Sequence, residues 1–142
     1  MPFGILFTIF STVGVVNAFN LIDGLNGLSS YITVSVAFSL SIIAFQAGNT
    51  QISIFLVLFV AAVLGFMALN FPMGKIFLGD GGAYALGHLL VWSSIILINS
   101  ASEISPFAVL LVFFWPVADT SLAIWRRWKL GNPTDRPDRL HF

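Results

Sequence analysis

Long apolar runs alternate with short polar segments along this chain. An α-helix needs roughly 17–25 mostly apolar residues to cross a bilayer. Four runs reach or approach that length, at about 28–45, 52–69, 84–98 and 106–125. A further apolar run at about 2–16 lacks the basic residues that open a signal peptide, so it also reads as a membrane helix. The pattern predicts an all-α polytopic membrane protein with about five transmembrane helices, forming a single integral membrane domain over residues 1–142.

Composition supports a membrane location. Of the 142 residues, 58% are hydrophobic and 8% are charged, and the mean hydropathy of +0.96 lies outside the range of soluble domains. Cysteine is absent, which excludes disulfides and thiolate metal sites. We expect membrane lipid, and no nucleic acid, among the partners of the chain.

The basic residues are confined to one side of the expected topology. Five helices in sequence place the segments 17–27, 70–83 and 126–142 on one membrane face, and the segments 46–51 and 99–105 on the other. All six basic residues belong to the first face: Lys75, Arg126, Arg127, Lys129, Arg136 and Arg139. The opposite segments contain a single charged residue, Glu103. By the positive-inside rule, the first face is predicted to be cytoplasmic.

The first polar segment on that face has a repeating pattern. Asn17, Asn20 and Asp23 recur every three residues, so on a helical end they would lie near one face. Asn26 and Gly27 then form a turn-forming pair. One interpretation is a hydrated helix end followed by a tight turn. The other is a binding site, since three carboxamides and a carboxylate exceed what a turn requires.

The second polar segment, 74–82, gathers glycines around a carboxylate. Glycines let backbone amides approach a phosphate, and the helix expected to start near Ala83 or Tyr84 would favour an anion at its N-terminus. Asp80 adds a hard oxygen ligand of the kind that suits Mg²⁺ bound to substrate phosphates. The alternative is a re-entrant loop in which Asp80 serves as a helix N-cap.

The last apolar run contains a proline and an acid. Pro116 is expected to kink or break the helix. Asp119 follows within the apolar run, and Arg126 lies seven residues later on nearly the same helical face. A structural ion pair and a role in a site are both open interpretations of Asp119.

Together these segments resemble the polyprenyl-phosphate N-acetylhexosamine-1-phosphate transferases, a membrane family also called glycosyltransferase family 4. Residues 17–28 resemble the asparagine and aspartate loop of that family, and residues 75–82 resemble its metal-binding loop. Residues 137–141, Pro-Asp-Arg-Leu-His, resemble the start of its histidine-rich loop. The three matches occur in the family's order and cover nearly the whole chain.

The resemblance implies a role for each matched residue. Asp80 would be the ligand of Mg²⁺ or Mn²⁺, and Asp23, Asp80 and His141 would be catalytic. Substrate-binding residues would be Asn17, Asn20, Asn26, Phe77 and Arg139, with Phe77 stacking on uracil and Arg139 contacting diphosphate. Asn26 departs from the pattern because that position is often aspartate, which puts an acidic role there in doubt.

The reaction implied by the resemblance transfers a sugar-1-phosphate, GlcNAc-1-phosphate in the first instance, from a UDP-sugar to undecaprenyl phosphate. UMP is released, and the product enters cell-envelope polysaccharides such as lipopolysaccharide. The implied location is the bacterial inner membrane, and family members often form homodimers. The chain lacks the acidic pair that the family carries in an early loop, so we expect it to be part of a larger enzyme and inactive alone.

Two interpretations from other classes remain. The chain could be a noncatalytic membrane module, such as half of a transporter whose loops bind an anion. It could also be a degenerate member of the family that is retained as a scaffold.

Overall fold

The computed structural model describes residues 2–129, which contain six helices and no strand. In chain order these helices are α1 (Pro2–Ile22), α2 (Leu28–Gln46), α3 (Thr50–Asn70), α4 (Gly79–Ser100), α5 (Pro106–Val112) and α6 (Phe114–Lys129). Within these residues, four helices are long and apolar enough to cross a membrane, and the bent α5–α6 pair brings the number of candidate spans to five if it is counted as one span. The prediction of an all-α polytopic membrane protein is confirmed.

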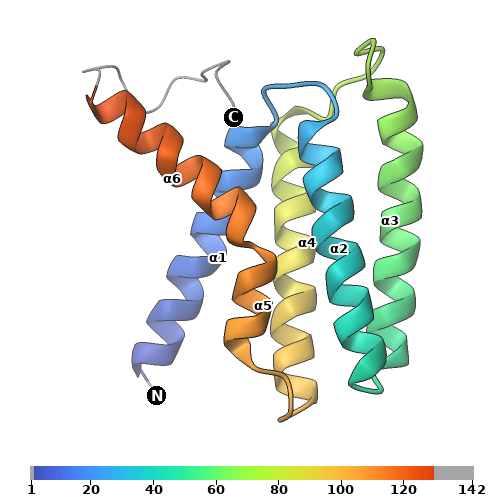
Figure 1. Ribbon diagram of the computed structural model, residues 1–142, viewed down its shortest axis with the longest axis vertical. Helices are drawn as coiled ribbons and strands as arrows, with labels where there is room; N and C mark the ends of the chain where they lie inside the picture. The colour runs from blue at the N-terminus through green and yellow to red at the C-terminus, as the bar shows by residue number, and fades with distance from the viewer. Residues whose placement is uncertain (1, 130–142) are drawn as a thin grey trace.

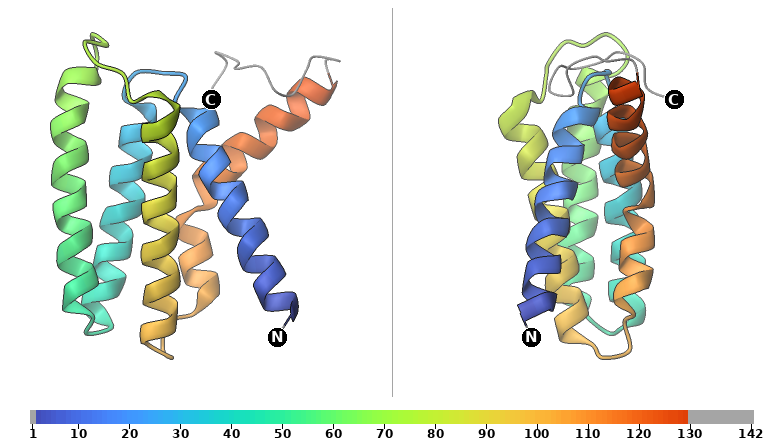
Figure 2. Two further views of the ribbon diagram at one scale, coloured as in Figure 1. Left: turned by 180° about the vertical axis from the view of Figure 1, so that it is seen from behind. Right: turned by 90° about the vertical axis from the view of Figure 1, so that its left-hand side faces the viewer.

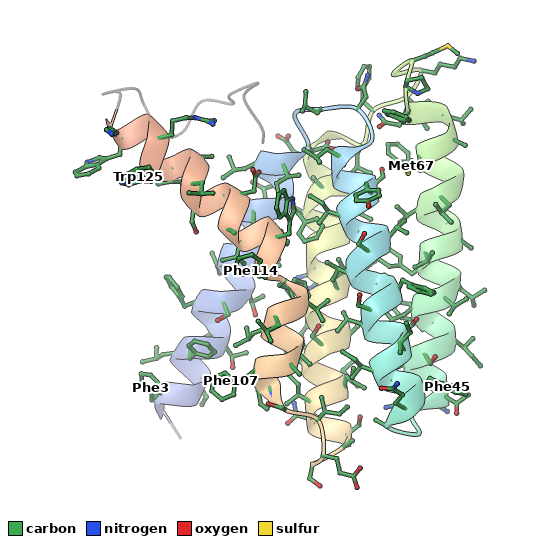
Figure 3. All side chains as sticks on the ribbon, viewed as in Figure 1. Phe3, Phe45, Met67, Phe107, Phe114 and Trp125 are labelled. Atoms are coloured by element: carbon green, nitrogen blue, oxygen red, sulfur yellow. The ribbon has the colours of Figure 1, made fainter. Side chains whose placement is uncertain are left out.

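The helices form a bundle whose long axes run roughly side by side (Figure 1). Helix α1 packs mainly against α4, and α2 packs mainly against α3. Fully buried apolar side chains join these pairs, among them Phe19 of α1, Leu40 of α2, Leu56 of α3 and Leu90 of α4. The outer faces instead carry large apolar side chains such as Phe3, Phe45 and Phe107, which point away from the bundle (Figure 3). An apolar exterior of this kind matches a lipid environment.

The last span is broken in the way that its proline predicts. Helices α5 and α6 meet at an angle of 61°, and α6 leans away from the bundle and across α1 (Figure 2). Pro116 lies in the first turn of α6, where its missing N–H costs nothing, but it leaves the carbonyl of Val112 without the partner that a continuous helix would supply. The break therefore falls at Phe113, before the proline itself.

The two motif loops are shorter than the sequence pattern suggested. Helix α1 continues to Ile22 and α4 begins at Gly79, so the loops comprise residues 23–27 and 71–78. We call these the first and second motif loops. The expectation of loops at 17–27 and 70–83 was wrong because polar residues remain compatible with helix: the carboxamide of Asn17 donates to the carbonyl of Val13 one turn earlier, at 2.9 Å.

Both motif loops lie at the same end of the bundle, together with the end of α6 (Figure 1). The connections at 47–49 and 101–105 lie at the opposite end. The predicted arrangement of the loops on two faces is therefore confirmed for the described residues. It brings residues 50 or more positions apart in sequence to one membrane face.

Candidate functional site

Asp23 begins the first motif loop, directly after α1, and is partly buried there. The hydroxyl of Ser29, in the first turn of α2, donates a hydrogen bond to its Oδ1. Burial raises the pKa of Asp23, the hydrogen bond from Ser29 lowers it, and the negative charge of Asp80 raises it further. Asp23 and Asp80 therefore lie at the same end of the bundle, although one follows α1 and the other begins α4.

Asp80 lies in the first turn of α4 and is exposed. Leu78 is the N-cap of this helix, and no side chain caps it. The alternative in which Asp80 is the N-cap is therefore wrong. A carboxylate in the first turn is favoured by the helix dipole, and the unpaired amides there can also face an anion. Gly79, with φ of 67°, lets the chain turn directly from the loop into the helix.

Asn20 connects the end of α1 to the start of α4. Its Nδ2 donates to the hydroxyl of Tyr84 at 3.1 Å. From the sequence, Tyr84 is expected only near the start of a helix, and no sequence signal assigns it to the site. The bond orients the Asn20 carboxamide next to the helical turn that carries Asp80.

The remaining predicted residues are spread around this end of the bundle. Asn17 is exposed on α1, and Phe77 is 76% exposed in the second motif loop. Asn26 is exposed in the first motif loop, and its Nδ2 donates to the carbonyl of Pro72 in the second at 3.5 Å. Arg139 and His141 lie outside the described residues. Asp119 is buried on α6 at 8% exposure.

Sequence analysis missed Asn70, the last residue of α3. It is 6% exposed, and its amide hydrogen-bonds both motif loops: Oδ1 accepts from the Gly27 N–H at 2.6 Å, and Nδ2 donates to the Ile76 carbonyl at 2.8 Å. A weak signal existed in the sequence, because a carboxamide ends an apolar run directly before Phe71 and Pro72.

Among the described residues, the site offers few side chains that could bind a metal ion. Within residues 2–129, no group of three or more His, Cys, Asp or Glu side chains is placed to hold a metal ion. The exposed carboxylate of Asp80 nevertheless suits Mg²⁺, which commonly binds one or two carboxylates and completes its shell with water and substrate phosphates. The residues present therefore fit a shared metal and phosphate site better than a closed metal cage.

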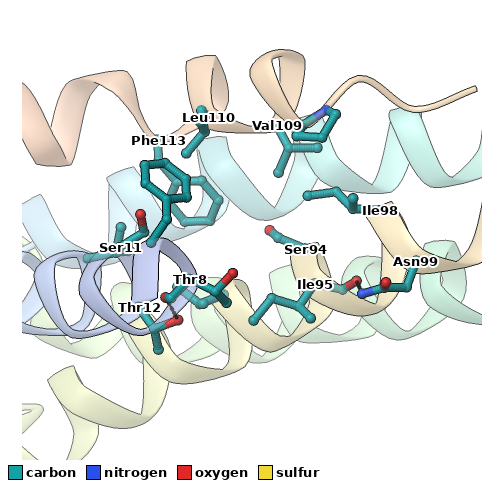
Figure 4. Close-up of a pocket in the computed structure, with 14 residues that line it drawn as sticks. Thr8, Ser11, Thr12, Ser94, Ile95, Ile98, Asn99, Val109, Leu110 and Phe113 are labelled. Atoms are coloured by element: carbon teal, nitrogen blue, oxygen red, sulfur yellow. Dashed lines mark hydrogen bonds between the residues drawn. The ribbon is translucent and has the colours of Figure 1, made fainter. Parts of the chain in front are cut away.

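A groove extends from this end of the bundle along α1. Its first cavity, of about 560 Å³, lies between α1 and the bent α5–α6 pair, and Asn17 lines it. A second cavity, of about 310 Å³, lies between α1, α4 and α5, with Thr8, Thr12, Ser94 and Val109 around it (Figure 4). The two cavities adjoin because they share the lining residues Ser11, Val15, Leu110 and Phe113. Most of the lining is apolar, so the groove suits a hydrocarbon chain.

Most of the chain matches the model of a known protein family. Residues 1–98 match the model described as glycosyl transferase family 4. This range contains both motif loops, Asn70 and both acids of the candidate site.

Curated relatives match nearly the whole chain. A probable undecaprenyl-phosphate N-acetylglucosaminyl 1-phosphate transferase of Bacillus subtilis is 34% identical over 136 residues, which is 95% of this chain and 38% of the relative. The undecaprenyl-phosphate alpha-N-acetylglucosaminyl 1-phosphate transferase of Escherichia coli is 30% identical, over 99% of this chain and 40% of the relative. A decaprenyl-phosphate N-acetylglucosaminephosphotransferase of Mycobacterium tuberculosis is 33% identical, over 97% and 39%. The chain thus spans about two fifths of the length of these relatives.

Proposed function

Because the chain belongs to glycosyl transferase family 4, we propose that it forms part of an enzyme that transfers GlcNAc-1-phosphate from a UDP-sugar to undecaprenyl phosphate. An oxygen of the lipid phosphate attacks the sugar-linked phosphorus, the bond from that phosphorus to the UMP oxygen breaks, and UMP leaves. The observation that carries the proposal is that both motif loops, with Asp23 and Asp80 beside them, lie at one end of a helical bundle with an apolar exterior. The product would serve cell-envelope polysaccharide synthesis.

Asp23 is assigned a catalytic role on the basis of its environment. Its raised pKa lets it hold a proton more readily than an ordinary aspartate, which suits removal of a proton from the attacking lipid phosphate. Ser29 occupies Oδ1, so Oδ2 is the atom proposed to take that proton.

Nucleotide-sugar binding is assigned to side chains around the two acids. Asn17, Asn20 and Asn26 offer carboxamides at this end of the bundle, and Tyr84 orients the carboxamide of Asn20. Phe77, at 76% exposure, presents an accessible ring on which uracil can stack. Arg139 and His141 are assigned to diphosphate binding and to catalysis by their motif alone.

Mg²⁺, with Mn²⁺ as a substitute, is proposed as the cofactor, and Asp80 as its protein ligand. A divalent ion supplies charge neutralisation to a reaction in which both substrates carry phosphate. Exposure of Asp80 in the first turn of α4 leaves room for water and phosphate ligands beside its carboxylate.

The polyprenyl tail is proposed to lie in the groove along α1. The groove opens beside Asn17 near the motif loops and continues toward the opposite face of the bundle, so a lipid in it could present its phosphate to Asp23 and Asp80. The motif face is proposed to be the cytoplasmic face of the bacterial inner membrane, because Lys75 and the basic end of α6 belong to it. The nucleotide sugar would arrive there from the cytosol.

The test uses the complete membrane protein that contains these residues, with UMP release measured against Mg²⁺ concentration. Asp80→Asn is expected to lower turnover by about 10²–10³-fold, because the amide cannot neutralise or hold the metal. Glu103→Gln is the matched control, since it makes the same change of charge in the loop at the opposite end of the bundle. Unchanged turnover and Mg²⁺ activation in Asp80→Asn would contradict the metal assignment.

A further inference from the structure

We infer that Asn70 is the positioning residue that holds the two motif loops, and with them Asp23 and Asp80, in a fixed relation. The geometric part of this inference stands on the hydrogen bonds of Asn70. Its consequence for turnover rests on the proposed function.

The side chain of Asn70 hydrogen-bonds one backbone group in each loop. Its Oδ1 accepts from the Gly27 N–H at 2.6 Å, and its Nδ2 donates to the Ile76 carbonyl at 2.8 Å. Gly27 lies four positions after Asp23, and Ile76 lies four positions before Asp80. The planar amide of Asn70 therefore bonds to both loops, in each case at a residue four positions away from the nearby acid.

The backbone of Asn70 adds a third link. Its carbonyl accepts from the Gly74 N–H at 2.7 Å, while the carbonyl of Leu69 accepts from the Lys75 N–H at 3.1 Å. These bonds fold the start of the second motif loop back onto the end of α3. The backbone of Asn70 is therefore held in place by hydrogen bonds, and its side chain points toward the first motif loop.

Close packing of the two loops makes their separation sensitive to small changes. A Cβ at Gly27 would lie 2.8 Å from the ring of Phe71, and a Cβ at Gly74 would lie 2.7 Å from Nδ2 of Asn26. Each loop thus contributes a glycine at a place where the other loop lies close to it. With Asn70 removed, the buried Gly27 N–H and the partly buried Ile76 carbonyl would lose their partner, which favours separation of the loops and entry of water.

A direct role in substrate binding fits Asn70 less well. The residue is 6% exposed, and both ends of its amide are already hydrogen-bonded to backbone groups. It therefore acts through the loops. Displacing a reacting group by about 1 Å can cost about 100-fold in rate, so a positioning role should appear in kcat more than in KM.

The chain offers a matched control in Asn49. Its side chain also makes two hydrogen bonds, accepting from the Ile52 N–H at 3.1 Å and donating to Ser100 Oγ at 3.0 Å. It joins the α2–α3 connection to the end of α4 at the opposite end of the bundle, away from both acids. Asn49→Ala thus removes the same kind of link without touching the motif loops.

The first experiment measures the loops directly. The chain contains no cysteine, so Leu25→Cys and Met73→Cys place one spin label on each loop, at positions that are 41% and 75% exposed. The complete membrane protein, without other cysteines, is expected to give a narrow distance distribution between the labels. Asn70→Ala should broaden or lengthen it, and Asn49→Ala should leave it unchanged. An unchanged distribution in Asn70→Ala overturns the inference, whatever the activity of the protein.

The second experiment measures UMP release by the unlabelled protein. Asn70→Ala is expected to lower kcat by about 10–100-fold with a small change in KM for the UDP-sugar, and Asn49→Ala should keep both values within about twofold. A lowered kcat together with an unchanged label distance would overturn the positioning role. If the loops separate in Asn70→Ala but Asp80→Asn keeps full turnover, the positioning role stands and the proposed metal site fails.

Asn70→Asp covers the case in which the alanine variant does not fold. It keeps an oxygen for the Gly27 N–H but, when ionised, loses the donor to the Ile76 carbonyl. We expect a broadened label distribution and a lowered kcat in this variant too. Wild-type values for both would overturn the inference.

Discussion

The carboxylate of Asp23 lies where its negative charge is disfavoured. Burial is the main cause of its raised pKa, and the charge of Asp80 adds to it, while the hydrogen bond from Ser29 opposes both. A raised pKa means that the folded state binds the proton more tightly than the unfolded chain does. The resulting stability is present below the ordinary pKa of 3.8 and is lost as the pH rises through the higher pKa of the folded state. At neutral pH the ionised Asp23 is therefore a source of instability.

Asp23→Asn should separate the stability of the protein from its activity. Without divalent metal, we expect a higher Tm than wild type at pH 7, and a difference that disappears as the pH falls below 3.8, because the amide removes the buried charge but can still accept from Ser29. Turnover should fall by about 10²–10⁴-fold, since the proposed proton acceptor is gone. Thermal unfolding across pH, with chelator present, and UMP release are the measurements. A lower Tm at pH 7 would contradict this account of the charge.

The residues of the candidate site lie at or near the ends of the helices rather than at their centres. Apolar periodicity located the spans correctly but placed the end of α1 near residue 16 and the start of α4 near residue 84, whereas the helices end and start at Ile22 and Gly79. Hydropathy leaves Asn17 and Asn20 outside the apolar run, although their spacing fits a helical end. The Asn17 carboxamide donates to the carbonyl of Val13 within α1, and that of Asn20 donates to the Tyr84 hydroxyl on α4. Such partners cannot be predicted from hydropathy.

Two glycines in the connections between helices test whether contact between the motif loops matters. Gly27 and Gly48 both have positive φ, at 83° and 75°, so alanine at either position should cost about 1–2 kcal/mol in backbone strain. Only at Gly27 would the new Cβ meet a neighbour, the ring of Phe71 at 2.8 Å, while at Gly48 no atom lies within 4 Å. We expect Gly48→Ala to lower Tm alone and Gly27→Ala to lower both Tm and the rate of UMP release. Equal effects on activity would argue against a functional contact between the loops.

At the scale of the whole molecule, the bundle divides its loops between two ends. The motif loops share one end, and the connections at 47–49 and 101–105 share the other (Figure 1). The groove between α1 and the bent α5–α6 pair runs between these ends. One face therefore combines access to water-soluble substrates with access to lipid, as the proposed reaction requires.

Single cysteines can test which end faces the cytoplasm, since the chain has none of its own. In intact bacterial cells with the outer barrier opened, Gly48→Cys and Glu103→Cys should react with a membrane-impermeant maleimide. Met73→Cys, which replaces a side chain that is 75% exposed, should react only after the inner membrane is permeabilised. The expectation follows from the placement of the basic residues. The reverse pattern would refute the proposed orientation.

The sequence by itself determined the all-α membrane fold, the apolar candidate spans, the proline break and the motifs of the family. These follow from hydropathy, backbone chemistry and charge, which are properties of single residues and their near neighbours. The tertiary structure alone decided that Ser29 donates to the partly buried Asp23, that Asn20 donates to Tyr84, and that Asn70 joins the two motif loops. Each of these depends on how helices pack, because a buried amide or carboxylate acquires its role from partners that are distant in the chain.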